Sequence, residues 1–429
     1  MDLVIPVSLY GSGLAVPMLI FIGLFLLATL SAVLLKSLHF PYTIGLVVIG
    51  MILGIAAECF EFLKPVLGVD LSRDLIMYVL LPALVYEAAI NIKLPSLLQE
   101  LVPVMMLAVV GVVLSTLLVA YLLNGLTPLS YAGALLFGAL ISATDPVAVL
   151  ALFKEIKAPE RLSLLMDAES LFNDATAIVM FGIVLTFIQI GGIFSGQMLL
   201  ASIQNFFYVF FGGIAVGSIL GFCMLFMLKI SRGIPFVQIA HTTILAFGSF
   251  IIADHFFEVS GVMSVIAAGV ITGNYCNKSM ADYTRLYISP YWAFMAFVAN
   301  SFIFLLLGLK EDLLFTDLER LQSTLPLLLL AVMTVLLARF LVVYLLVPAS
   351  NCLSEGDPVD ARSKVIMFWG GLRGVVPVAL MLSIPDSIPE KQLIIDMTLV
   401  VVLFSLLVQG TTIEWLMTRL GIKRCRSSL

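Results

Sequence analysis

The sequence predicts an all-α polytopic membrane protein with about thirteen transmembrane helices. Of its 429 residues, 62% are hydrophobic and only 11% are charged, whereas a soluble protein carries about 25% charged residues. Apolar runs of roughly 18 or more residues recur from end to end, and each is long enough to cross about 30 Å of hydrocarbon. The runs lack the alternation of apolar and polar residues that a transmembrane β-barrel shows.

The apolar runs fix the expected spans to within a few residues. The first run has no basic n-region and no small-residue cleavage site, so we expect a retained span rather than a signal peptide. No loop can hold a soluble domain, and the tail 417–429 is short, so we expect residues 1–429 to form a single integral membrane domain. The expected spans are 14–35, 40–58, 73–91, 101–124, 130–153, 162–188, 206–228, 236–257, 260–276, 290–309, 324–348, 364–384 and 393–416.

The distribution of basic residues supports this number of spans. Loops on the cytoplasmic side of membranes are enriched in Lys and Arg. Two of the 22 basic residues, Arg339 and Arg373, lie within spans. With the N-terminus outside, the other basic residues divide unequally between the loops on the two sides of the membrane. A miscounted span would scramble this division, so we expect thirteen spans, with the N-terminus outside and the C-terminus in the cytoplasm. The outer loops hold only Lys64, Arg73, Lys310, Arg320 and Lys391, and the inner loops hold all the others.

Composition also excludes several classes of function. The net charge is −5 and no basic patch is present, so we expect no nucleic-acid partner. The five cysteines have no CxxC spacing, which argues against a disulfide framework or a metal centre. No Ser-His-Asp, metal-ligand or cofactor pattern indicates an enzyme. We expect no cofactor and no soluble partner, only contact with membrane lipid.

Charged residues within the spans are the candidates for function. A charge near the bilayer centre costs about 2.5–3.5 kcal/mol even on insertion scales, so such residues need partners or water and mark functional sites by default. The residues expected at mid-span are Glu87, Asp145, Glu169, Asp174, Arg339 and Arg373.

The sequence Thr144-Asp145-Pro146 predicts a helix break that carries a carboxylate. Proline lacks an N–H and clashes with the carbonyl four residues back, and it pushes the preceding residue out of the α region. Within a membrane, freed carbonyls are tolerated only where they line a cavity or find new partners. The break therefore offers oxygen ligands for a small cation.

The segment Glu169–Asp174 predicts a divided helix surface. Ser170 and Asp174 are four residues apart and share one face, and Glu169 and Asn173 share a second face offset by about 100°. We expect Ser170 and Asp174 to face a site together with Asp145. Two carboxylates close together in a low dielectric favour binding of a cation or of protons, and competition between the two is the physical basis of an exchanger.

The two arginines need partners as well. Arg339 is alone in its span, and Glu169 is the acid left over once Asp145 and Asp174 are assigned to the ion, so we expect an Arg339–Glu169 pair. Arg373 lies in a Gly-rich stretch with Pro377, which predicts a second broken helix where the arginine offsets the partial charges of opposing helix ends.

The two breaks fall in the fifth and the twelfth expected spans, seven apart. Two six-span halves separated by one span have opposite topology, and inverted repeats of this kind place their broken helices at a site near the midplane. The expected repeats are about 14–188 and 236–416, linked by the span 206–228. Glu87 follows Pro82 by about a helical turn and is either a further acid near the ion path or a structural acid on the side of a dimer.

Five sequence blocks carry a resemblance to a known family. SATDPVAVLALF followed by ESLFNDATAIV resembles the monovalent cation:proton antiporter-1 family, the NhaP-like sodium/proton exchangers. Further blocks that match in order are GVMSVIAAGVITGN, LLARFL and GGLRGVVPVAL.

The resemblance implies an antiporter fold of the NhaA and NhaP type, with inverted repeats and two crossing broken helices. It also implies a homodimer in the cell membrane that works by alternating access. Asp174 would be the essential ion- and proton-binding carboxylate, and Asp145, Ser170 and the Thr144 backbone would complete the site. Electrogenic relatives have an aspartate where this chain has Asn173, so an electroneutral exchange of one Na⁺ or Li⁺ for one proton is implied.

The resemblance also implies that Glu169 and Arg339 form a bracing pair that holds Asn173. Other functions remain open from the residues alone. A K⁺/H⁺ antiporter would use the same oxygen ligands. A cation channel or uniporter would move ions without a counter-ion, and a symporter of an organic anion would need more cationic groups than Arg373.

Overall fold

The computed structural model describes residues 15–37, 40–69, 72–156, 158–190, 196–279, 282–310, 318–353 and 358–422. These residues form helices joined by short connections, with no strand among them, so the all-α prediction is confirmed. Nine described helical segments are long and apolar enough to cross a membrane, and three shorter apolar helices accompany them. The count of thirteen crossings stays a prediction, and the end of the expected tail, 423–429, lies outside the described residues.

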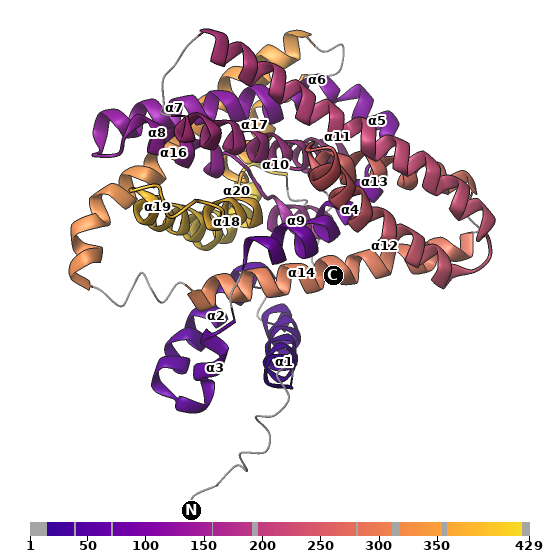
Figure 1. Cartoon of the computed structure of the whole chain (residues 1–429), viewed down its shortest axis with the longest axis horizontal. Helices are drawn as coiled ribbons and strands as arrows, with labels where there is room; N and C mark the ends of the chain where they lie inside the picture. Colours follow the sequence, from indigo (N-terminus) through magenta and orange to yellow (C-terminus); the bar gives the residue numbers. More distant parts are fainter. Residues whose placement is uncertain are drawn as a thin grey trace, which may run out of the picture.

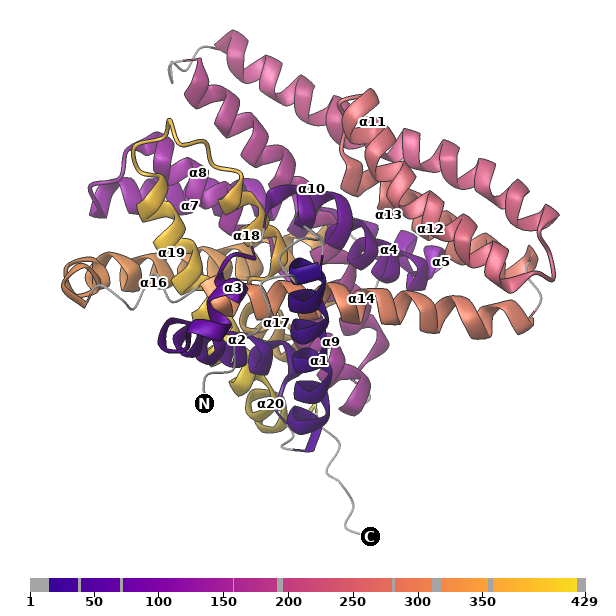
Figure 2. The ribbon, with the colours of Figure 1, turned by 60° about the horizontal axis from the view of Figure 1, so that its bottom comes forward.

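The helices pack in two groups, whose members can be followed by their labels in Figure 1 and Figure 2. The first group contains most of the helices that come before α6 and the helices from α11 to α14. Its elements are α1 (Ala15–Ser37), α2 (Tyr42–Cys59), η2 (Glu61–Leu63), α3 (Lys64–Leu67), η3 (Leu75–Leu80), α4 (Leu81–Asn91), α11 (Gly196–Ile230), α12 (Pro235–Ile251), η5 (Ile252–Phe256), α13 (Gly261–Ser279) and α14 (Asp282–Lys310). The short helix α5 (Leu94–Gln99) leads from this group to the second and packs against α6 and α10.

The second group contains both interrupted helices. Its elements are α6 (Leu101–Met105), η4 (Met106–Val110), α7 (Gly111–Leu126), α8 (Tyr131–Ile141), α9 (Val147–Ile156), α10 (Glu160–Gln189), α16 (Leu318–Leu353), α17 (Ala361–Trp369), α18 (Val375–Leu382), α19 (Lys391–Phe404), η6 (Ser405–Gln409) and α20 (Gly410–Arg419).

The packing of the first group has an internal regularity. The helices α2, α4, α13 and α14 correspond to the second, third, ninth and tenth expected spans. The second packs along the tenth, and the third packs along the ninth. The expected repeat relates the second span to the ninth and the third span to the tenth, so it maps one packed pair onto the other. This is the packing that an inverted repeat produces. The repeat boundaries themselves stay a prediction.

Several helices extend beyond the ranges expected from hydropathy. α11 begins at Gly196 rather than at residue 206, and α14 begins at Asp282 rather than at residue 290. A helix satisfies its own backbone hydrogen bonds outside hydrocarbon as well as inside it. Hydropathy therefore marks only the apolar part of a helix, and the polar turns that continue it are missed.

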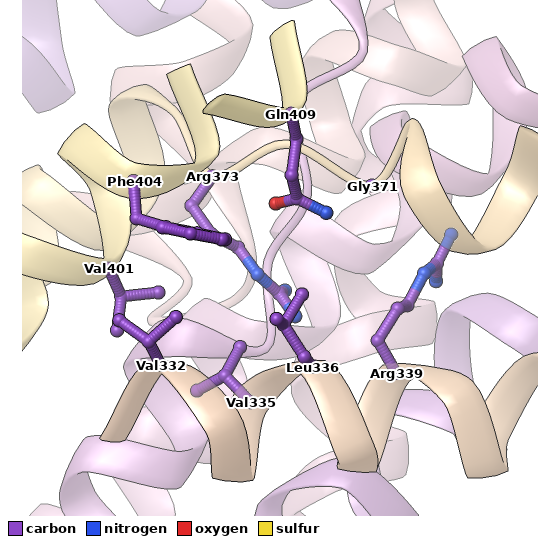
Figure 3. Close-up of a pocket in the computed structure, with 9 residues that line it drawn as sticks. All are labelled: Val332, Val335, Leu336, Arg339, Gly371, Arg373, Val401, Phe404 and Gln409. Carbon is purple, nitrogen blue, oxygen red and sulfur yellow. The ribbon is translucent and has the colours of Figure 1, made fainter. Parts of the chain in front are cut away.

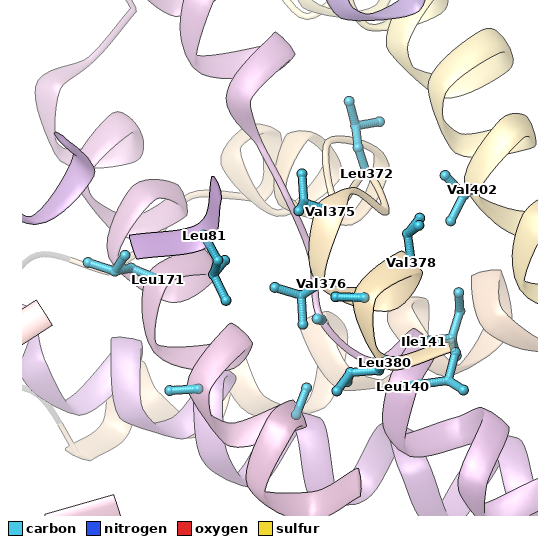
Figure 4. Packing of buried hydrophobic residues seen from close by; sticks show 14 of the residues in the cluster. Leu81, Leu140, Ile141, Leu171, Leu372, Val375, Val376, Val378, Leu380 and Val402 are labelled. Atoms are coloured by element: carbon cyan, nitrogen blue, oxygen red, sulfur yellow. The ribbon is translucent and has the colours of Figure 1, made fainter. Parts of the chain in front are cut away.

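The half-helix α18 is enclosed by protein. Its residues from Val375 to Met381 are all buried, and Figure 4 shows valines of α18 among side chains of α8, α10 and α19. The start of its partner half-helix, α17, is fixed outside the apolar region by Asp360. The carboxylate of Asp360 accepts a hydrogen bond of 2.9 Å from the Ser363 N–H, and bonding to Ser363 holds the pKa of Asp360 below its usual value.

Candidate cation site

The first break separates α8 from α9 and is organised by Asp145. α8 ends at Ile141 and α9 begins at Val147. The Asp145 Oδ1 accepts a hydrogen bond of 3.0 Å from the Val147 N–H, so Asp145 acts as the N-cap of α9. Pro146 lies directly before the first residue of α9, where its missing N–H removes no helical hydrogen bond. The break predicted at Thr144-Asp145-Pro146 is confirmed.

The second break separates α17 from α18, as the Gly-rich stretch around Arg373 predicts. α17 ends at Trp369, and Gly374 precedes the first residue of α18. Pro377 falls in the first turn of α18, where helical N–H groups have no intrahelical acceptor. A Cβ on Gly374 would overlap the carboxylate of Asp145, so only glycine allows the two breaks to approach this closely.

The two breaks are bonded to each other. The Asp145 N–H donates to the Leu372 carbonyl at 2.8 Å, and the Asp145 carboxylate lies against Gly374, directly before the first residue of α18. Asp145 thus lies at the N-terminal ends of both α9 and α18. Helix N-termini carry a partial positive charge of roughly 0.5, and two of them lie next to this one carboxylate.

Arg373 contacts the C-terminal end of a helix, whereas Asp145 lies at N-terminal ends. Its Nη1 donates to the carbonyls of Ser142 at 2.9 Å and Ala143 at 3.0 Å, just beyond the C-terminus of α8. Helix C-termini carry a partial negative charge. The predicted position of Arg373 against opposing helix ends is therefore confirmed for α8.

Two polar residues of α10 hold the backbone of the first break. The Ser170 Oγ donates to the Thr144 carbonyl at 2.6 Å. The Asn173 Nδ2 donates to the Thr144 Oγ1 at 2.6 Å, and its Oδ1 accepts from the Thr144 N–H at 3.2 Å. All three residues are buried. The described hydrogen bonds of the Asn173 amide go to Thr144 on both sides, and the expectation that Glu169 and Arg339 hold Asn173 stays a prediction.

Asp174 differs from its neighbours on α10. It is half-buried and lies near enough to Asp145 for their charges to interact. No described residue donates a hydrogen bond to its carboxylate. Asp145 is also half-buried, whereas Ser170 and Asn173 are buried. The two carboxylates expected to bind the ion are thus the two that retain access to the surface.

Glu169 is paired with Arg339 inside the protein, as the search for a counter-ion predicts. Nη1 and Nη2 of Arg339 both donate to the Glu169 carboxylate, and the exposed fractions of the two side chains are 8% for Arg339 and 2% for Glu169. Nη2 also donates to the Met367 carbonyl at 2.9 Å, in the last turn of α17. Arg339 therefore donates to a backbone carbonyl at the C-terminus of α17, as Arg373 donates to carbonyls at the C-terminus of α8.

Glu87 is not part of this constellation. Asn91, one turn further along α4, donates from Nδ2 to the Glu87 Oε1 at 3.1 Å. Among the described residues no group of three or more acids, histidines or cysteines could hold a metal ion together, so Glu87 does not join Asp145 and Asp174 as a third ligand. Its possible structural role on the side of a dimer stays a hypothesis.

The arginines border two small cavities. Each has a volume of about 10 Å³, and both are lined by Arg339 and Arg373. One lies toward Glu169, Asn173 and Ser142. The other lies toward Gly371, Phe404 and Gln409 and is drawn in Figure 3.

Sequence reasoning misses two polar residues that support the second break. The Ser405 Oγ accepts from the Arg373 N–H at 3.0 Å, and the Gln409 Nε2 donates to the Trp369 carbonyl at 3.1 Å. Both lie on the π-helical turn η6 and are buried. Their signal is the presence of two polar residues, four apart, in the apolar run from 393 to 416. The same reasoning that singles out charges passes over neutral polar side chains.

The chemistry available at the crossing is narrow. Two carboxylates lie beside neutral oxygens from Ser170 and Thr144, and the remaining charges are paired or placed at helix ends. Carboxylate, hydroxyl and carbonyl oxygens suit hard cations. Such a set of oxygens can hold a cation, and protons can bind to the same carboxylates.

The fold and the site define a membrane protein that brings two carboxylates together where two broken helices cross. The family model for the transmembrane sodium/hydrogen exchanger matches residues 22–419. The chain is 36% identical over 400 residues to the Na⁺/H⁺ antiporter ApNhaP of Aphanothece halophytica, covering 92% of this chain and 72% of the relative. It is 33% identical over 406 residues to the Na⁺/H⁺ antiporter NhaP of Pseudomonas aeruginosa, covering 90% and 92%.

A solved structure has the same fold. The sodium proton antiporter MjNhaP1 of Methanocaldococcus jannaschii superposes with a TM-score of 0.71 at 22% identity, covering 94% of this chain and 99% of that one. The chain belongs to the sodium/hydrogen exchanger family.

Proposed function

We propose that this protein exchanges one Na⁺ or Li⁺ for one proton across the cell membrane, by alternating access and without net movement of charge. The observation that carries the proposal is the pairing of Asp145 and Asp174, two half-buried carboxylates beside the crossing of two broken helices. The names of the relatives, which are Na⁺/H⁺ antiporters, favour these ions.

In this proposal the cation is bound by oxygen atoms only. Asp145 and Asp174 supply the charge, and the Ser170 hydroxyl and the Thr144 carbonyl supply neutral ligands. The Thr144 carbonyl accepts one hydrogen bond from Ser170, and a carbonyl oxygen has a second lone pair for the ion. A proton binds to the same pair of carboxylates when the cation leaves, so the cation and the proton compete for one site.

The proposed stoichiometry depends on which side chains can bind and release a proton or a cation during transport. Glu169 is neutralised by Arg339 in a buried pair, and Asn173 carries no charge. The exchangeable charge is therefore that of Asp145 and Asp174. We assign one proton to each cation, so that the site carries the same charge in both directions across the membrane.

The proposal includes an assembly and an orientation. We propose a homodimer, which the resemblance to NhaP-like exchangers supports. The excess of Lys and Arg in one set of loops supports an N-terminus outside the cell and a C-terminus in the cytoplasm.

The test is transport by purified protein in liposomes. An imposed Na⁺ gradient should drive proton movement, and K⁺ with valinomycin should be used to set the membrane potential. We expect the same rate at every potential for Na⁺ and Li⁺. Proton movement driven by K⁺ but not by Na⁺ would establish the K⁺/H⁺ alternative. Cation flux without proton movement, with a rate that depends on potential, would establish a channel or uniporter.

A further inference from the structure

The cavity of Figure 3 lies between the two arginines and η6. Its polar lining comes from Arg339, Arg373 and Gln409, and Gly371 forms part of its wall. The rest of the lining is hydrocarbon from α16 and α19. Two side chains that the chain places 70 residues apart, Arg339 and Gln409, thus face one space of about 10 Å³.

One donor in this space has no protein acceptor. Both Nη atoms of Arg339 are used by Glu169 and by the Met367 carbonyl. Its Nε is buried, and no acceptor among the described residues bonds to it. A Cβ on Gly371 would lie 2.7 Å from this Nε, so the glycine leaves the N–H open. Buried donors are nearly always satisfied, which points to an acceptor within the cavity.

The size and the polarity of the cavity identify the acceptor. A volume of about 10 Å³ is roughly what one water molecule requires, and a buried water needs two to four polar partners. Arg339 Nε and the Arg373 guanidinium can donate to a water. The Oε1 of Gln409 can accept from it, because the amide Nε2 of this residue is already committed to the Trp369 carbonyl. A small anion fits less well, since Asp145 and Asp174 already concentrate negative charge at this crossing.

We propose that Gln409 is a positioning residue for transport, which acts through one buried water. By its direct bond to Trp369 it holds the end of α17. Through the water it orients the guanidinium of Arg339, which in turn fixes Glu169 and with it the part of α10 that carries Ser170 and Asp174. The proposal rests on the proposed function, because the property that Gln409 tunes is the affinity of that site for the cation.

Two substitutions separate the acceptor role from mere packing. Gln409→Met keeps the length of the side chain and removes both hydrogen bonds. Gln409→Glu loses the N–H donor but keeps an oxygen that accepts from the water or from Arg339. A hydrogen bond of this kind contributes about 0.5–1.5 kcal/mol, so Gln409→Met should raise the apparent KM for Na⁺ about two- to tenfold. Gln409→Glu should stay closer to the wild type.

The matched control is Gln238→Met in α12. Gln238 is buried and donates from Nε2 to the Leu228 carbonyl at 2.8 Å, but it is in the other group of helices. This control should lose a similar amount of thermal stability and keep the wild-type KM for Na⁺. A purely structural role of Gln409 would give equal changes in both Met variants and no advantage of Glu over Met.

The direct measurement is a high-resolution electron cryomicroscopy map of the wild-type protein. We expect one density peak within hydrogen-bonding distance of Arg339 Nε and Gln409 Oε1. An empty cavity, or Gln409→Glu and Gln409→Met with the same KM, overturns the inference. If the wild type moved no protons under a Na⁺ gradient, the proposed function would fail, and the density peak would still report separately on the water.

Discussion

The backbone N–H of Asp145 donates a hydrogen bond of 2.8 Å to the carbonyl of Leu372, which joins the two interrupted helices at their breaks. The side chain of the same residue lies against Gly374, directly before α18. The position of the Asp145 carboxylate therefore depends on the second break as much as on its own helix. A change at either break should be measurable as a change in cation binding.

Replacing Asp174 should abolish exchange. Asp174→Ala removes the carboxylate that no described donor engages, so the site can hold neither the cation nor the proton that replaces it. Proton movement driven by Na⁺ in proteoliposomes should fall to the level of empty liposomes. The control is Asp167→Asn, two helical turns earlier on α10, which should retain exchange. Normal transport by Asp174→Ala would refute the assignment of the site.

The Glu169–Arg339 pair should be more sensitive to the loss of one partner than to the loss of both. Removing one member of a buried ion pair leaves an uncompensated charge and costs about 3–5 kcal/mol, whereas replacing the whole pair with apolar residues is often close to neutral. Glu169→Gln and Arg339→Met should each lower the Tm in detergent strongly. The double variant should recover part of the loss. Additive losses in Tm would show that the two charges do not interact.

Gly374→Ala should weaken cation binding without unfolding the protein. The added Cβ would collide with the Asp145 carboxylate and displace it from the crossing. We expect a rise in the apparent KM for Na⁺ of about tenfold, equal to roughly 1.4 kcal/mol. Gly182→Ala on α10 is the control, because a Cβ there meets nothing within 4 Å. Equal KM values for the two variants would contradict the close approach of the breaks.

Thr144→Val tests the contact between the first break and Asn173. Valine has a similar shape but removes the Oγ1 that accepts from the Asn173 Nδ2 at 2.6 Å. The buried amide then lacks an acceptor, at a cost of about 1–3 kcal/mol. The apparent KM for Na⁺ should rise several-fold, and Thr144→Ser, which keeps the oxygen, should restore it. A KM that is insensitive to both changes would separate Asn173 from the cation site.

The pH profile of exchange should be bell-shaped. At low pH, protons occupy Asp145 and Asp174 and exclude Na⁺. At high pH, Na⁺ binds but the protons that displace it are scarce. If one proton competes with one Na⁺, a tenfold rise in Na⁺ should move the acidic limb down by about one pH unit. Rates measured at several Na⁺ concentrations provide the test, and a profile that rises steadily with pH at fixed Na⁺ would count against competition.

The arrangement of charged side chains could be predicted from the sequence because charge is costly in apolar surroundings. Arg339 has no other basic or acidic residue in its expected span, which was enough to require a counter-ion and to suggest Glu169. The breaks could be predicted because Pro146 and the glycines near Arg373 act locally on the backbone.

The partners of main-chain groups could not be predicted in this way. The carbonyls of Leu372 and Met367 have no signature in the sequence, since every residue has a carbonyl and only the fold decides which ones meet. The same limit applies to Asn173. Its side chain forms hydrogen bonds to the backbone and hydroxyl of Thr144, whereas the expectation from the sequence tied it to the charged pair.

The bonds between the two breaks have a mechanical consequence. Since Asp145, Leu372, Arg373 and Ala143 are cross-linked by hydrogen bonds, the crossing resists internal shear, and a displacement of one half-helix must carry the other with it. Sliding is cheaper where only hydrocarbon meets hydrocarbon. The buried residues Leu81 of α4 and Leu171 of α10, both labelled in Figure 4, belong to two helices that pack together across the two groups. In the proposed exchange, the ion would move together with this rigid unit. The unit would slide along a layer of aliphatic side chains.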